Sequence, residues 1–315
     1  MDLRGKRILL TGSRGFLGSY IASILRTKDP EEIRAPDSKN YDLRVKENCI
    51  EVVKDIDIVF HIAGVTGGIG FTKKHPGSVF YDNLIMGTNI MEESRIAHVE
   101  KFISTGTVCS YPKFSPTPFN EVDIWNGYPE ETNASYGLSK KMQIVQSQAY
   151  REEYGFNSVV LVVTNLYGIG DNFDPHTSHV IPSLITKIFN AKKENKTEIE
   201  LWGDGTPTRD FIHVDDAARA FVLAAEHYDK SKPINIGSGF EISIKDLCVK
   251  ILDLMDVKLK IKWNTSYPNG QLHRVLDISK AFDEFRFKPK MSFDDGLKEL
   301  INSFVKNQNL SQNGH

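Results

Sequence analysis

Short apolar runs alternate with helix-like patterns along the first half of the chain. Strands are predicted at residues 6–12, 57–63, 101–104 and 158–165, and helices at residues 16–25, 83–98 and 136–154. Strands that alternate with helices predict a parallel sheet whose strands are joined by crossover helices. The fold class that we expect is therefore α/β, with a Rossmann-type doubly wound parallel sheet.

The rhythm changes after Gly168. A loop rich in glycine, aspartate and proline follows, then a helix from Ile181, a strand at residues 234–238 and a helix from Ile244. We expect residues 1–165, with about 209–240, to form the Rossmann domain. Residues 166–208 and 241–305 should form a smaller C-terminal α+β lobe that holds the substrate. Residues 306–315 are polar and aperiodic, which predicts a disordered tail.

Composition narrows the class of protein. Of the 315 residues 40% are hydrophobic, enough for a sizeable core, and a net charge of -2 argues against nucleic-acid binding or a basic membrane-binding surface. The longest apolar run, residues 159–163, is far too short to span a bilayer, and no signal-peptide pattern precedes the first strand. Three scattered cysteines (Cys49, Cys109 and Cys248) suggest neither disulfides nor a metal site. We expect a cytoplasmic protein.

A glycine-rich segment, TGSRGFLG, lies between the first predicted strand and the first predicted helix. Gly12, Gly15 and Gly18 would let the backbone approach a pyrophosphate at the helix N-terminus. A tight structural turn is the alternative. The end of the next strand carries Arg34, and Arg14 lies in the glycine loop, so two guanidinium groups could bind a 2′-phosphate. This favours NADP over NAD, unless Arg34 is only a surface residue and Asp37 takes the usual acidic role.

Two further segments carry candidate chemistry. Tyr136 and Lys140 are four residues apart at the start of a predicted helix, hence on one face, and a nearby ammonium would lower the pKa of the phenol. The tyrosine could then exchange a proton with a sugar oxygen while a hydride moves. Cys109 follows a predicted strand within GTVCSYPK, although a lone cysteine more often packs in a core.

Taken together, these motifs resemble the extended short-chain dehydrogenase/reductase family, and within it the GDP-L-fucose synthase branch. The resemblance covers nearly the whole chain. It rests on the stretches GGI at residue 67, CSYPK, YGLSK, TNLYG, DNFDPHTSHVIP and LWGDGTPTRDFIHVDD. The chain departs from the branch where Thr107 replaces serine and Lys187 replaces arginine. It also lacks the lysine usually found before the GGI segment.

The resemblance implies roles for individual residues. The expected catalytic residues are Thr107, Cys109, Tyr136, Lys140 and His179, with Cys109 and His179 as the acid–base pair for epimerisation. Contacts to NADP are expected from Gly12, Arg14, Gly15, Phe16, Leu17, Gly18, Arg34, Asp42, Leu43, Ala63, Lys140, Thr164, Asn165, Leu166 and His179. The GDP-sugar substrate would be held by Cys109, Asn165, Lys187, Trp202, Arg209 and Arg274.

A thiol and an imidazole suit the implied reaction, inversion of C3 and C5 in a 4-keto sugar followed by reduction of C4. Protons on carbons next to the ketone are acidic, and inversion requires one group to remove a proton and another to return it from the opposite face. For Trp202 a core position is an alternative. The resemblance also suggests a homodimer formed through the helices at 83–98 and 136–154.

Three other functions remain open. A 4-epimerase or 4,6-dehydratase would recycle bound NAD, but dehydratases carry an Asp-Glu pair where this chain has Val108 and Cys109. An NADP-sensing regulator on the same fold would not need the Tyr136 and Lys140 pair. A 4-keto reductase without inversion would not need Cys109 and His179 together.

Overall fold

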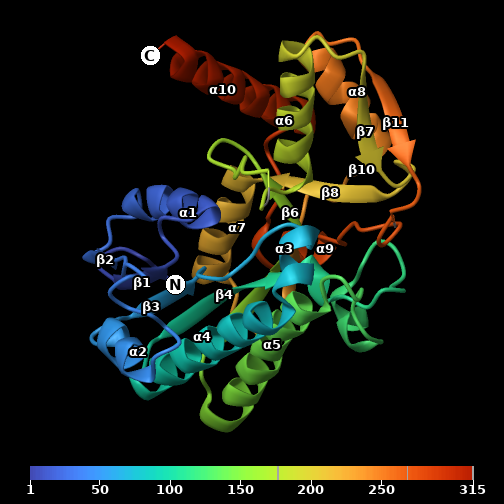
Figure 1. The fold of residues 1–315 in the computed structure, drawn as a ribbon. Coiled ribbons are helices and arrows are strands. Elements are labelled where there is room, and N and C mark those ends of the chain that lie inside the picture. Colours follow the sequence, from blue (N-terminus) through green and yellow to red (C-terminus); the bar gives the residue numbers. More distant parts are fainter. Residues whose placement is uncertain (176, 268, 314–315) are drawn as a thin grey trace.

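The computed structural model describes residues 1–175, 177–267 and 269–313, and its centre is a parallel sheet (Figure 1). The strand order is β2-β1-β3-β4-β5-β9. These strands are β2 (Glu32–Arg34), β1 (Arg7–Thr11), β3 (Ile58–His61), β4 (Lys101–Thr107), β5 (Ser158–Val163) and β9 (Ile234–Ile236). The predicted Rossmann-type α/β class is confirmed. Because β2 and β3 flank β1, the strand order reverses there, which creates a ligand-binding crevice at the strand ends.

Successive strand residues pack into different cores because a parallel sheet is covered on both faces. On β1, Ile8 and Leu10 belong to one hydrophobic cluster, whereas Leu9 belongs to another. The first cluster includes side chains of α1 (Phe16–Arg26), α7 (Val214–His227) and α9 (Ser279–Phe285). The other face is covered by α2 (Lys46–Val53), α4 (Pro76–Ile96) and α5 (Ala134–Tyr154). All three β1 side chains are fully buried.

Helix α4 begins earlier than the predicted residue 83. Its first residue is Pro76, and proline favours this position because its fixed φ suits a helix and its missing N–H has no partner to lose. A short helix, α3 (Ile69–Lys74), precedes it. Two 3₁₀-helices, η1 (Val108–Ser110) and η2 (Glu121–Trp125), lie between β4 and α5.

The second part of the molecule lies above the sheet in Figure 1 and has its own hydrophobic cluster. One three-stranded sheet contains β10 (Glu241–Ser243), β8 (Thr208–His213) and β6 (Asn165–Tyr167), and a parallel pair contains β11 (Lys260–Asn264) and β7 (Glu198–Trp202). Three helices pack with them, namely α6 (Val180–Lys193), α8 (Ile244–Leu254) and α10 (Phe293–Asn313).

Two sequence-based predictions need correction. The tail predicted as disordered from residue 306 is helical as far as Asn313, while the last two residues lie outside the described part. Helix α10 is anchored in the core by Leu297, Leu300 and Phe304, and extending such a helix costs far less than starting one. The segment 279–285, placed in the substrate lobe, instead packs as α9 against the Rossmann side through Ala281. With that change, the two-domain division remains our proposal.

Within the described residues, no helix is both long enough and apolar enough to cross a membrane.

Candidate active site

The glycine-rich loop brings the ends of β1 and β3 together. Gly12 has a φ of +71°, and a Cβ placed there would lie 2.7 Å from the backbone nitrogen of Ala63. A Cβ on Gly18 would come within 2.1 Å of the Gly12 carbonyl oxygen. Thr11 fastens the two strand ends, because its hydroxyl accepts hydrogen bonds from Ile62 and Ala63, both 3.2 Å long. Only glycine allows this close approach, so the loop fits a dinucleotide pyrophosphate.

The first turn of α1 follows directly from this loop. Gly15 is the N-cap residue and makes no side-chain capping bond, Leu17 is buried, and Phe16 packs against the same core. The N-terminal backbone N–H groups of the helix therefore depend on other partners, which an anion can supply.

The two predicted phosphate-binding arginines are already engaged. Arg14 forms an ion pair with Asp37. Arg34 donates to the carboxylate of Glu32 at 3.0 Å and to the carbonyl oxygen of Lys54 at 2.6 Å. Arg34 is therefore tied to the sheet edge, while Arg14 is largely exposed beside the glycine loop. Of the two, Arg14 is better placed to meet a 2′-phosphate.

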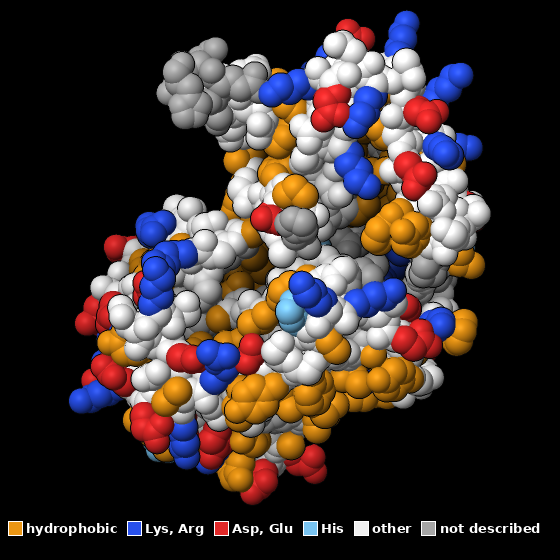
Figure 2. Space-filling model, in the orientation of Figure 1, with side chains coloured by type: hydrophobic (Ala, Val, Ile, Leu, Met, Phe, Trp, Pro, Cys, Tyr) orange, Lys and Arg blue, Asp and Glu red, His pale blue; other side chains and the backbone are white. Residues whose placement is uncertain are grey.

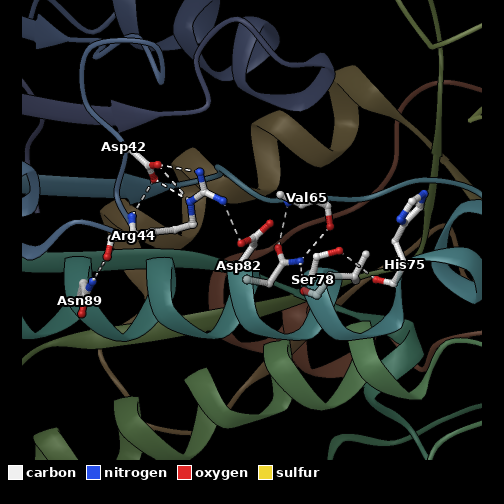
Figure 3. Close-up of polar contacts among 9 residues, drawn as sticks. Asp42, Arg44, Val65, His75, Ser78, Asp82 and Asn89 are labelled. Carbon is white, nitrogen blue, oxygen red and sulfur yellow. Dashed lines mark hydrogen bonds and ion pairs between the residues drawn. The ribbon is translucent and has the colours of Figure 1, made fainter.

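Hydrogen bonds and ion pairs hold Asp42 and Leu43, both expected to contact the cofactor, against α4; those of Asp42 are drawn in Figure 3. Arg44 donates to Asp42 at 2.7 Å and reaches Asp82 of α4 at 3.0 Å. The side chain of Asn89 donates to the carbonyl oxygen of Leu43 at 3.3 Å. The segment after β2 is thereby held against the helix that covers the sheet.

The segment that carries Cys109, η1, packs against the first turn of α5. Thr107, the last residue of β4, caps η1 by accepting a hydrogen bond of 3.2 Å from the backbone N–H of Cys109. Ser110 donates to the carbonyl oxygen of Gly137 at 2.8 Å, and a Cβ on Gly137 would lie only 2.1 Å from the Cys109 carbonyl oxygen. The chain has no room for a side chain here, so Cys109 and Tyr136 are fixed as neighbours.

Lys140 lies one turn further along α5 and is almost completely buried. Its ammonium donates to the hydroxyl of Thr105 at 3.4 Å, and burial lowers its pKa to about 8. His61, at the end of β3, is also buried, and its Nδ1 lies 2.9 Å from the Thr11 hydroxyl. Burial, with the nearby charge of Lys140, lowers the pKa of His61 to about 3, so this ring is neutral.

Tyr136 does not have the lowered pKa expected from its spacing to Lys140. Burial, followed by the effect of Cys109, raises the pKa of this phenol, and a hydrogen bond with Thr66 offsets only part of that. The expectation was wrong because helical spacing places two residues on one face but does not fix the distance between the phenol oxygen and the ammonium. Tyr136 is therefore a phenol at neutral pH, the form that can donate a proton.

Thr66 belongs to a loop that links Tyr136 with the segment before His179. The backbone N–H of Gly68 donates to the carbonyl oxygen of Thr177 at 3.2 Å, and a Cβ on Gly68 would lie 2.8 Å from the Ser178 carbonyl oxygen. His179 follows at once as the N-cap of α6. Its side chain is accessible to solvent, yet the protein atoms around it lower its pKa through desolvation. Thr66 had no sequence signal except its position before the GGI segment.

Arg209 and Arg274 converge on the same place from the second part of the chain. The guanidinium of Arg274 donates to the sulfur of Cys109 at 3.7 Å and to the side chain of Gln271 at 3.2 Å. Arg209 donates to the carbonyl oxygen of Gln271 at 2.8 Å. Burial, together with repulsion from Arg274, lowers the pKa of Arg209 to about 9. The sequence could not place Arg274 beside a cysteine 165 residues away.

The other predicted residues are less closely grouped. Asn165 and Thr164 donate to the carbonyl oxygen of Asp210 at 2.8 and 3.0 Å, and Leu166 packs against the Rossmann core. Trp202 is 61% exposed and stacks on Tyr267 with ring centroids 4.4 Å apart, so the alternative of a core tryptophan is wrong. Lys187 is exposed on α6.

A recess separates the Rossmann part from the upper part on the face shown in Figure 2. Among the described residues, no group of three or more histidine, cysteine or acidic side chains is arranged to hold a metal ion. The candidate side chains described here carry a thiol, a phenol, an imidazole and two guanidinium groups.

The chain is similar to known proteins both in sequence and in fold. A GDP-L-fucose synthase of Sinorhizobium fredii (strain NBRC 101917 / NGR234) is 38% identical over 307 residues, which cover 97% of each chain. The structure of a GDP-mannoheptose C4 reductase from Campylobacter jejuni with NADP bound superposes with a TM-score of 0.86 at 25% identity, covering 97% of this chain and 99% of that one. A GDP-L-fucose synthetase from Naegleria fowleri bound to NADP gives a TM-score of 0.84 at 25% identity, covering 97% and 96%.

A family model also matches residues 8–237, a span that begins in β1, includes the glycine loop and the Tyr136–Lys140 pair, and ends just after β9. The match thus covers the whole six-stranded sheet apart from the first residue of β1. On this evidence the chain belongs to the NAD dependent epimerase/dehydratase family.

Proposed function

We propose that this chain is an NADPH-dependent epimerase-reductase that converts a GDP-4-keto-6-deoxy sugar, GDP-4-keto-6-deoxymannose, into GDP-L-fucose. The observation that carries the proposal is the position of Cys109. It packs against the first turn of α5, is close to Tyr136 and is in contact with Arg274. A sugar reductase needs the phenol and the lysine, but only inversion at carbon needs a thiol there as well.

In the epimerisation steps, Cys109 and His179 move the protons. One group removes the proton from C3 or C5, and the electron pair of the broken C–H bond delocalises onto O4 as an enolate; the other group returns a proton to the opposite face. Desolvation lowers the pKa of His179, and the ring is accessible to solvent, so it can take up from water the proton that it returns to carbon. Both groups can thus act as base or acid.

The enolate oxygen would be held by two hydroxyl groups. The oxygen of Thr107 already accepts a hydrogen bond from the Cys109 backbone, which leaves its own O–H free to donate. Tyr136 is protonated because burial raises its pKa. Fixed donors of this kind stabilise negative charge as it develops on O4.

Reduction follows at the same carbonyl group. NADPH, when bound, supplies the hydride to C4. Tyr136 gives its proton to O4, and Lys140, buried one turn away, contributes positive charge that stabilises the resulting phenolate. The Gly12 and Gly18 contacts supply the cradle for the pyrophosphate, and Arg14 is the arginine we assign to the 2′-phosphate. Two similar structures contain NADP, which supports this choice of cofactor.

Substrate binding is assigned to the second part of the chain. Arg209 is the principal candidate for the diphosphate, because it is a buried cation close to Cys109. Glu130 is also near enough to act on its charge, but the hydrogen bonds of its guanidinium go to backbone oxygens. Trp202 is available at the surface to stack on a nucleobase, supported by Tyr267.

We further propose a homodimer formed through α4 and α5. Figure 2 shows a hydrophobic area over these helices, whose exposed apolar side chains include Phe80, Tyr81, Met142, Val145 and Tyr154. A surface of this kind favours association with a second copy. Sedimentation of the wild type and of Val145→Glu would test it.

We place the protein in the cytoplasm, because its three free cysteines suit a reducing compartment.

The alternative class is a C4 reductase that leaves C3 and C5 unchanged, and one of the similar structures is named a GDP-mannoheptose C4 reductase. The experiment that separates the two is identification of the product by NMR after incubation with NADPH and GDP-4-keto-6-deoxymannose. GDP-L-fucose supports the proposal. A product with C3 and C5 unchanged supports the reductase, and no consumption of NADPH contradicts both.

A further inference from the structure

Arg274 is a buried arginine whose guanidinium contacts a sulfur atom. Several guanidinium groups elsewhere pair with a carboxylate; examples are Arg7 with Asp57, Arg44 with Asp42, Arg95 with Glu92, and Arg219 with Asp216. For Arg274, which is only 7% exposed, no carboxylate partner is found among the described residues. Burying a cation is costly unless an anion compensates it.

The group that the Arg274 guanidinium does reach is the sulfur of Cys109, at 3.7 Å from Nη1. A thiol becomes an anion on losing its proton, and a thiolate accepts hydrogen bonds from guanidinium N–H groups. A Cys109 thiolate would therefore place a negative charge in direct contact with the Arg274 guanidinium, which has no carboxylate partner among the described residues.

Hydrogen bonds hold both the side chain and the backbone of Arg274 in place beside Cys109. Gln271 accepts from Nε of Arg274 at 3.2 Å and donates to the carbonyl oxygen of Lys113, in the loop after Cys109, at 2.9 Å. The carbonyl oxygen of Arg274 accepts from the backbone N–H of Asp210 at 2.9 Å. Side chain and backbone are therefore fixed before any substrate arrives.

We propose that Arg274 is the positioning residue that keeps Cys109 in the thiolate form, ready to take a proton from the sugar carbon. This differs from the diphosphate-binding role predicted from the sequence, which we now assign mainly to Arg209. The inference rests on the proposed function, because a thiolate is useful here only as a base for inversion.

Other charged or titratable groups also face Cys109 from the elements around it. Tyr136 approaches from α5, and the guanidinium of Arg209 approaches from β8. Arg209, however, is hydrogen-bonded to the backbone oxygens of Thr208 and Gln271. The direct hydrogen bond to sulfur comes from Arg274, so removal of this arginine should affect the thiol more than removal of Arg209.

The test is the rate at which iodoacetamide alkylates Cys109 between pH 6 and 10, followed by mass spectrometry of the peptide, without substrate or cofactor. The reagent is neutral, so arginine charges do not attract it. In Arg274→Gln the rate at pH 7 should fall about tenfold and the midpoint of the pH–rate profile should rise by about one unit, since one unit is a tenfold change in thiolate. Arg274→Lys keeps the charge and should restore most of the rate.

Controls separate this effect from unfolding. Cys49 and Cys248 are fully buried and should stay unmodified in every folded variant, and NADPH binding should persist. Arg209→Gln should slow alkylation less than Arg274→Gln does. An unchanged profile in Arg274→Gln, an equal shift in Arg209→Gln, or a lysine variant as slow as the glutamine variant would overturn the proposal. Because no sugar is used, these results do not depend on which product the enzyme makes.

Discussion

The carbonyl oxygen of Cys109 packs directly against Gly137, so that a Cβ built on this glycine would lie 2.1 Å from the oxygen. The contact joins the loop that carries the thiol to the helix that carries the phenol and the lysine. The two segments meet without a side chain between them, so the thiol and the phenol lie close together and can act on the carbon and oxygen protons of one substrate.

Gly137→Ala tests this contact. The added methyl group must push the Cys109 loop away from α5, so we expect turnover to fall at least about tenfold and the free energy of unfolding to fall by about 1–3 kcal/mol. Steady-state kinetics and urea denaturation measure the two effects. Gly77→Ala in α4 is the matched control, because a Cβ there meets nothing within 4 Å. Normal turnover in Gly137→Ala would show that the loop position does not matter.

Lys140→Met should inactivate the enzyme and stabilise it at pH 7. Burial lowers the pKa of Lys140 from 10.5 to about 8, so the buried charge costs about 3 kcal/mol at neutral pH. The unfolded chain binds more protons than the folded one between about pH 8 and 10.5, so wild-type stability gains on the variant as the pH rises through this window. The advantage of the methionine variant should therefore shrink.

Urea denaturation without cofactor at pH 7 to 10 measures this difference. The exposed Lys193→Met is the control and should follow the wild type. A methionine variant that is less stable than the wild type at pH 7 would mean that the ammonium has favourable partners that offset its burial.

Cofactor choice should depend on Arg14 more than on Arg34. Loss of the exposed arginine in Arg14→Ala removes a charged contact to the 2′-phosphate, so KM for NADPH should rise about tenfold while KM for NADH changes little. Arg34→Ala should change cofactor preference less, because its guanidinium is bound to Glu32 and to the carbonyl oxygen of Lys54. Equal effects of Arg14→Ala on both cofactors would contradict the assignment, as would a preference of the wild type for NADH.

Cys109→Ser should slow inversion without emptying the cofactor site. A hydroxyl group is a far weaker acid than a thiol, so we expect deuterium exchange from solvent into C3 and C5 to slow about 100-fold. Exchange is measured by NMR of the sugar, and NADPH binding by the fluorescence of the cofactor. Unchanged exchange would return Cys109 to the role of a packing residue.

Local patterns predicted much of this molecule. The glycine loop could be recognised because a strand, a tight turn and a helix are consecutive in sequence, and the contacts of Gly12 and Gly18 follow from that order. The start of α4 at Pro76 also has a local signal, because proline favours the first helical position. The helical end of α10 has no such local signal. It continues from preceding turns whose Leu297 and Phe304 are packed in the hydrophobic core.

The contacts that complete the site could not be predicted in this way. Thr66 meets Tyr136, and Arg274 meets Cys109, across long stretches of chain. Such pairs depend on how the second part of the chain packs on the sheet. Spacing alone also gave the wrong direction for the pKa of Tyr136, since burial outweighs the charge expected from Lys140.

The most direct measurement is the position of deuterium in the product formed in D₂O from GDP-4-keto-6-deoxymannose and unlabelled NADPH. The account predicts GDP-L-fucose with deuterium at C3 and C5, delivered by Cys109 and His179, and with hydrogen from the cofactor at C4. A reduced product with hydrogen retained at both C3 and C5 would contradict it.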